Sequence, residues 1–199
     1  MKKTITALVL IALIAVMSAS AAEAYSYETG DQAFSFKAGL TIPAFIWFPN
    51  DSTDSGFVSG SETHMKLGGI GSLSYMYFVS PKIAIGGTLG YSFNYSRSAE
   101  LVTEVPIMAK ASWYPVQTGR FDLIASLSLG IAFTRYSGGF YTSPAAEIEI
   151  EPVFYFNDNW GIGISSGLLG VSEIYWKEKK EDTSIAALAP IKLTCHYRH

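Results

Sequence analysis

The sequence predicts an all-β protein, an eight-stranded antiparallel up-and-down β-barrel that crosses a membrane. Three observations indicate this fold. Long segments alternate between apolar residues and small or polar residues, and short and long connections alternate between those segments. The chain is also 49% hydrophobic, yet after residue 24 it has no apolar run long enough for a spanning helix. A spanning helix needs about 20 apolar residues, whereas a membrane strand needs only about 10 residues with alternate side chains facing lipid.

Residues 83–95 form the clearest of these segments. Along this segment, large apolar side chains such as Ile85, Leu89 and Tyr91 alternate with small or polar ones. Successive side chains of a strand point to opposite faces. Small residues suit a narrow interior, and aliphatic and aromatic residues suit lipid and its interfaces. We therefore expect the apolar face to lie on the outside of the barrel.

The same period of two marks seven further segments. They span residues 33–48, 65–78, 101–114, 121–136, 145–156, 160 to about 171, and 183–199. Pro43 predicts a bend or bulge, because proline cannot donate to the strand ladder. The connections 80–82, 117–119 and 157–159 are tight turns by composition, and the remaining ones, such as 137–144, are longer. This alternation predicts short periplasmic turns, longer external loops and two periplasmic termini.

The N-terminus predicts a secretory signal peptide. Lys2 and Lys3 precede an apolar stretch at 8–16, and small residues follow up to Ala24. We expect a signal at 1–24 and a single outer-membrane barrel domain at 25–199. Cys195 is the only cysteine, so no intramolecular disulfide can form. The 14 basic and 17 acidic side chains provide no basic footprint for nucleic acid, so no nucleic-acid partner is expected.

Charged residues on the inward positions predict a polar, ion-paired interior. An eight-stranded barrel is just wide enough for side chains or one small ligand, and buried charges are costly unless they are paired. The predicted lumen charge network comprises Lys37, Lys66, Glu104, Lys110, Glu147, Glu149, Glu151, Lys192, His196 and Arg198. We expect this network to be structural rather than a relay or gate. Some inward positions carry apolar residues instead, such as Met76 and Met108. An apolar pocket inside the barrel is therefore an alternative.

Aromatic residues near strand ends predict a girdle at the membrane interface. The predicted girdle comprises Tyr75, Tyr77, Trp113, Phe121, Phe154, Phe156, Trp160 and Tyr197. The pairs 77–78, 113–114 and 155–156 each precede a tight turn, and we interpret them as part of it. The alternative is that aromatic residues simply favour strands.

The residues that could act in catalysis or bind a metal form no convincing set, so we expect no enzyme, no cofactor and no metal site. The only histidines are His64, His196 and His199. His64 lies near Ser61 and Glu62 in the first long connection, and such a cluster is common by chance. His196 and His199 have opposite parity on a strand, so they would point to different faces.

Two segments carry a family resemblance. The opening strand Phe-Ser-Phe-Lys-Ala-Gly-Leu at 34–40 and the segment Val-Pro-Ile-Met-Ala-Lys-Ala-Ser-Trp-Tyr at 105–114, with the signal and the eight alternating segments, resemble small bacterial outer-membrane barrels of the OmpW, OmpX and OmpA-domain type. The resemblance implies a location in the outer membrane, folding by the outer-membrane assembly machinery and, for OmpW-like members, passage of small hydrophobic molecules. The chain departs from these barrels by ending on His199 instead of an aromatic residue.

These observations lead to one expected function and two alternatives. We expect a non-enzymatic integral outer-membrane protein, either a surface-exposed structural barrel or a narrow conduit for small hydrophobic molecules. Its expected partners are outer-membrane lipid, the assembly machinery, and a small hydrophobic ligand or host surface molecules. The alternatives are a soluble secreted lipocalin-like ligand-binding barrel and a lipid-modifying outer-membrane enzyme.

Overall fold

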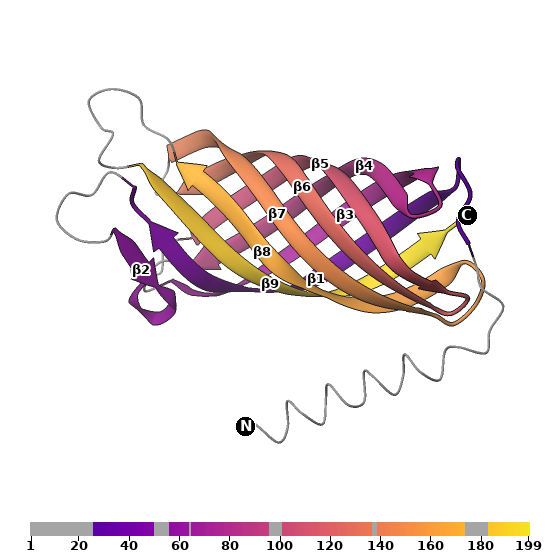
Figure 1. Ribbon diagram of the computed structural model, residues 1–199. Coiled ribbons are helices and arrows are strands. Elements are labelled where there is room, and N and C mark those ends of the chain that lie inside the picture. Colours follow the sequence, from indigo (N-terminus) through magenta and orange to yellow (C-terminus); the bar gives the residue numbers. More distant parts are fainter. Residues whose placement is uncertain (1–25, 50–55, 64, 96–100, 137–138, 174–182) are drawn as a thin grey trace, which may run out of the picture.

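The computed structural model describes residues 26–49, 56–63, 65–95, 101–136, 139–173 and 183–199. Within these residues, eight long strands form a closed antiparallel barrel (Figure 1). They are β1 (Gln32–Trp47), β3 (Lys66–Ser80), β4 (Ile83–Tyr95), β5 (Leu101–Thr118), β6 (Phe121–Tyr136), β7 (Gly139–Tyr155), β8 (Trp160–Glu173) and β9 (Ser184–Arg198). Each long strand pairs with the next one along the chain, and pairing of β1 with β9 closes the barrel.

A short strand and a 3-10 turn belong to the first long connection. Strand β2 (Phe57–Ser59) pairs with the end of β1 at residues 45–47, and the turn η2 (Gly60–Thr63) follows it. Figure 1 shows β2 at the end of the barrel opposite the C-terminus. We call this end the loop end, and the opposite end, which carries the tight turns and the C-terminus, the turn end. In the described part of the chain, no helix has the length and apolar character needed to cross a membrane.

The eight predicted strands are all present, but their ends and connections differ at three places. Strand β5 continues to Thr118, past the predicted end at 114 and into the predicted turn 117–119, and β2 lies in the first long connection. The bounds of β4 and β6 are those that the sequence predicts. The expected bulge at Pro43 is confirmed by a register shift between Pro43 and Phe45. The expected loop at 137–144 is wrong, because residues 139–144 continue β7 and pair with β6 up to Tyr136. The pairing of β6 with β7 thus lengthens the hairpin where a loop was expected.

The two faces of the barrel wall differ as the alternation predicts. Lys37, Glu151 and Lys192 are buried inside, each only 1% exposed. Large aliphatic and aromatic side chains face outward on all eight long strands, and Leu193 is 69% exposed. A lipocalin-like soluble barrel would have the opposite arrangement, with apolar side chains inside and polar ones in water.

The interior is layered along the barrel axis. The turn-end cluster comprises Tyr27, Ala33, Met76, Phe78, Ala84, Tyr114, Ile124, Val153 and Tyr155. The loop-end cluster comprises Ile70, Met108, Ala132, Ala145, Leu169, Val171 and Leu188. In β7, three glutamates lie between Ala145 of the loop-end cluster and Val153 of the turn-end cluster. These three glutamates therefore occupy the middle of the lumen, between two apolar layers.

Glycines permit neighbouring strands of this narrow barrel to approach closely. A Cβ atom at Gly39 would lie 2.0 Å from the Ile191 carbonyl oxygen, and one at Gly130 would lie 2.1 Å from the Ile107 carbonyl oxygen. Backbone atoms cannot move aside as a flexible side chain can, so any larger residue forces the two strands apart. Close backbone approach is a recognised reason for glycine inside a strand.

We predict that Gly130→Ala destabilises the barrel by about 1–3 kcal/mol, the usual cost of overpacking. Gly71→Ala is the matched control, because its Cβ would meet its nearest neighbour, the Lys37 carbonyl oxygen, at an ordinary 3.7 Å. The measurement is urea unfolding in detergent micelles, followed by tryptophan fluorescence. Equal unfolding midpoints for the two variants would contradict this role of Gly130.

Candidate functional site

An ion-pair network in the middle of the lumen joins four strands through one carboxylate. Glu149 of β7 accepts hydrogen bonds at Oε2 from Lys37 Nζ of β1 at 2.8 Å and from Lys110 Nζ of β5 at 2.9 Å. Its Oε1 lies 2.9 Å from Lys192 Nζ of β9. None of these three strands is a sheet neighbour of β7, so the bonds cross the lumen instead of following the wall.

The other two glutamates of β7 complete the charge balance of this network. Lys37 Nζ also donates to Glu151, and Lys192 Nζ donates to Glu147 Oε1 at 2.6 Å. Three lysines thus face three glutamates in a buried setting. Burial of charge is costly, and mutual pairing with hydrogen bonds offsets that cost. The network fills the lumen and couples opposite walls of the barrel.

A second polar network lies at the turn end, around Tyr27. Tyr27 Oη donates to Asp122 Oδ2 at 2.7 Å and lies 3.1 Å from Tyr155 Oη. The Arg198 guanidinium stacks over the Tyr155 ring at 3.6 Å, and its Nη1 lies 3.6 Å from Asp122 Oδ2. Arg198 also donates to the Gly119 and Asp158 carbonyl oxygens in two of the tight turns. These contacts close the lumen at the turn end.

His196 connects the two networks. Its Nε2 lies 3.4 Å from Glu151 Oε1, and its Nδ1 lies 3.5 Å from Tyr155 Oη. A continuous set of polar contacts therefore runs from the lysines in the middle of the barrel to Tyr27 at the turn end.

Three members of the turn-end network were absent from the predicted set, namely Asp122, Tyr155 and Tyr27. Asp122 lies on the inward parity of β6, so the alternation carried the signal that places it in the lumen. Tyr27 precedes β1 and belongs to no alternating segment, so strand parity holds no information on it. In the structure its ring stacks on Phe78, with centroids 3.9 Å apart, and plugs the turn end.

The predicted network also contained a residue that faces outward. Lys66 is exposed, because a register shift between Lys66 and Gly69 reverses the parity at the start of β3 and sets Lys66 opposite the exposed Tyr95. This prediction was wrong, since a bulge cannot be seen in the alternation.

Glu104 is buried as predicted, yet among the described residues its carboxylate has no ion pair. It accepts one hydrogen bond, from Ser92 Oγ at 3.0 Å.

The aromatic pairs before the tight turns divide between the two faces. Tyr77, Trp113 and Phe156 are exposed on the outer face, whereas their neighbours Phe78, Tyr114 and Tyr155 are buried in the turn-end cluster. Interpreting whole pairs as a girdle was therefore wrong, because adjacent strand residues face opposite sides. The structure places all the individually predicted girdle residues on the outer face: Tyr75, Tyr77, Trp113, Phe154, Phe156 and Trp160 are exposed, and Phe121 and Tyr197 are half-buried.

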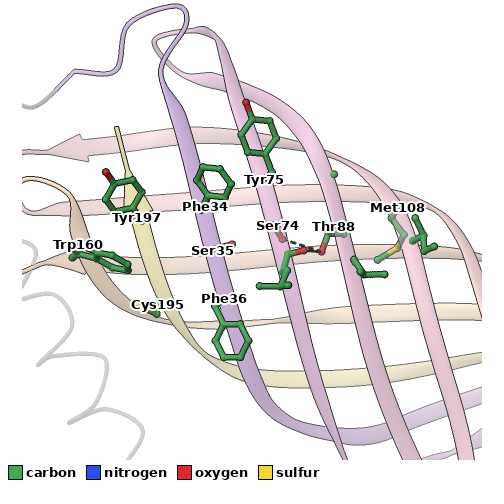
Figure 2. Close-up of a pocket in the computed structure, with 14 residues that line it drawn as sticks. Phe34, Ser35, Phe36, Ser74, Tyr75, Thr88, Met108, Trp160, Cys195 and Tyr197 are labelled. Carbon is green, nitrogen blue, oxygen red and sulfur yellow. Dashed lines mark hydrogen bonds between the residues drawn. The ribbon is translucent and has the colours of Figure 1, made fainter.

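The outer wall has an apolar recess of about 600 Å³ near the turn end. Figure 2 shows aromatic side chains that line it on neighbouring strands, namely Phe34, Phe36, Tyr75, Trp160 and Tyr197. Gly87 lies opposite Tyr75 in the β3–β4 register and leaves the wall open there. The recess faces away from the lumen and contains almost no polar surface, so it suits an apolar chain rather than a polar substrate.

A smaller cavity of about 370 Å³ lies inside the loop end. Its lining includes Ile46, Met65, Val102, Glu104, Tyr141 and Val171. Val171 belongs to the loop-end cluster and Met65 packs against it, so the cavity ends on an apolar floor. Glu104 provides its carboxylate in otherwise largely apolar surroundings.

The residues considered for catalysis and metal binding do not converge where the structure describes them. Glu62 is exposed in η2, whereas His64 and the Ser61 side chain lie outside the described residues. His196 belongs to the lumen network, and His199 is exposed at the C-terminus. In the described residues, no group of three or more His, Cys, Asp and Glu side chains is arranged to hold a metal ion.

Comparisons with known proteins agree with this architecture. A protein-family model matches residues 16–197. Ail of Yersinia pestis, solved with the heparin analogue sucrose octasulfate, is 13% identical with a TM-score of 0.50, over 87% of this chain and 100% of that one. Neisserial surface protein A is 13% identical with a TM-score of 0.52, over 84% and 96%. Among curated proteins, no sequence matches. The two structural likenesses show the fold of a small outer-membrane β-barrel.

We predict that Glu149→Gln destabilises the barrel by about 3–5 kcal/mol, the usual cost of removing one partner from a buried ion pair. The amide keeps the size of the side chain but leaves three buried lysines with two carboxylates. Glu28→Gln is the control, because Glu28 is exposed outside the strands. Urea unfolding of both variants in micelles checks this expectation, and an unchanged midpoint for Glu149→Gln would show that the network contributes no stability.

Proposed function

We propose that this chain, which belongs to the small eight-stranded outer-membrane β-barrels, is a non-enzymatic integral protein of the outer membrane that acts as a surface-exposed structural barrel with a closed lumen. The packed, ion-paired interior carries this proposal. Glu149 and its three lysines fill the middle of the barrel, and Tyr27 and Arg198 fill its turn end. A barrel of this size holds side chains or at most one small ligand. This filling favours a structural barrel over a conduit along the whole lumen.

The outer face supports residence in a lipid bilayer. Its exposed aliphatic residues would be a poor surface in water, whereas closure of β1 on β9 leaves no unpaired strand edge in lipid. The apolar recess in the wall offers space to a lipid acyl chain. In the same proposal, residues 1–24 are a cleaved signal peptide. The outer-membrane assembly machinery recognises the alternating apolar residues of β9, the last of which is Tyr197.

We place the loop end outside the cell and the tight turns with both termini in the periplasm. The loop end carries exposed aromatic residues, Phe57 on β2 and Phe140 on β7, which offer contact area for molecules at the surface. Host surface molecules are the partners we propose for this end. The structure of Ail with a heparin analogue is a precedent among barrels of the same fold.

Closure of the lumen predicts that the reconstituted protein does not admit small sugars. Proteoliposomes containing the refolded chain are expected to swell in isotonic arabinose no faster than empty liposomes, because no water-filled path passes the ion-pair network. A general porin at the same protein-to-lipid ratio is the positive control. Swelling at a rate near that of the porin would contradict the closed barrel and favour a conduit.

The orientation predicts different labelling of the two ends in intact cells. In a Cys195→Ser background, a membrane-impermeant maleimide is expected to label Phe140→Cys directly, because the loop end faces the medium. It is expected to label Asn157→Cys, in a tight turn, only after the outer membrane has been permeabilised. The reverse pattern would show that the barrel is inserted the other way.

A further inference from the structure

The loop-end cavity combines an apolar wall with one buried acid. Glu104 is 8% exposed and lines the cavity together with Val102, Met65 and Val171. The cavity volume of about 370 Å³ lies at the small end of the range of roughly 300–1,000 Å³ that is typical of ligand pockets. Such pockets are mostly apolar, with a few polar groups that orient the ligand.

Within the part of the chain that the structure describes, Glu104 differs from the other lumen glutamates in having no ion-pair partner. Glu147, Glu149 and Glu151 all contact lysines, whereas Lys66, which was predicted to belong to the same lumen network, is turned outward by the bulge in β3. Among the described residues, Ser92 Oγ is the only hydrogen-bond donor to the Glu104 carboxylate. An ionised carboxylate in an apolar site is costly until a cation or further donors reach it. The position therefore favours a ligand that brings a positive charge.

We propose that the loop-end cavity binds a small amphipathic cation, an aryl- or alkylammonium ion. Its ammonium group donates to Glu104, and its apolar body packs on Val102 and Val171 above the loop-end cluster. Charge-assisted hydrogen bonds of this kind are roughly twice as strong as neutral ones. The site extends the proposed function without depending on it, because binding at the loop end requires no passage through the lumen.

The test uses three probes that share one apolar body and differ in charge. These are 3-phenylpropylammonium, 3-phenylpropan-1-ol and 3-phenylpropanoate, titrated by calorimetry into the refolded barrel in nanodiscs of zwitterionic lipid, with empty nanodiscs as the blank. The ammonium ion is expected to bind at least tenfold more tightly than the alcohol, and the carboxylate is expected not to bind. Equal affinities for the ammonium ion and the alcohol would overturn the proposal.

Variants then assign the binding to this site. Glu104→Gln is expected to lower the affinity for the ammonium ion about tenfold and to leave that for the alcohol unchanged, whereas Glu62→Gln, an exposed acid of η2, changes neither. Val102→Phe reduces the cavity and is expected to weaken all binding, which keeps the test decisive if Glu104→Gln fails to fold. Full affinity for the ammonium ion in either Glu104→Gln or Val102→Phe would refute the site. Neither result bears on closure of the lumen, which the swelling assay measures separately.

Discussion

Charge neutralisation inside a narrow closed barrel is the constraint on which the rest of this structure depends. Eight strands enclose a space that side chains must fill, and the inward positions of this chain carry many ionisable groups. Glu149 contributes most to this neutralisation, because it contacts lysines of three strands that are not sheet neighbours of β7. The apolar clusters above and below exclude solvent from these pairs. Remove the neutralisation, and the lysines of β1, β5 and β9 repel one another in a medium that screens charge poorly.

Strand alternation predicts most of this architecture because side-chain direction in a strand depends only on parity. That rule placed Lys37, Lys110 and Glu149 inside and predicted their pairing as a set, although their individual partners follow from the tilt and register of the strands. The same rule failed at Lys66, where a bulge reverses parity and has no signature in composition. Strand parity also makes no prediction for Tyr27, because this residue lies before the first strand. Aromatic composition alone does not distinguish the two members of a pair such as Tyr77 and Phe78, which face opposite sides of the wall because they are adjacent on a strand.

The layers of the lumen assign different roles to the two ends of the barrel. At the turn end, Arg198 and the rings of Tyr27 and Tyr155 close the interior and hold the turns and the last strand together. At the loop end, the apolar cluster stops short of the mouth and leaves a cavity that contains Glu104. A small molecule entering from that end would meet an apolar floor and one carboxylate before it met the lysine network. This arrangement favours recognition at the surface over passage across the membrane.

The most direct test of the central claim is solid-state NMR of the lysine side chains in the barrel reconstituted in lipid and labelled with nitrogen-15. The ammonium groups of Lys37, Lys110 and Lys192 are expected to exchange protons slowly with water and to show cross-peaks to glutamate carboxylates, because they are buried and paired. Rapid exchange at all three ammonium groups, as at the exposed Lys66, would mean that water fills the lumen, and the account of a closed, self-neutralised barrel would be wrong.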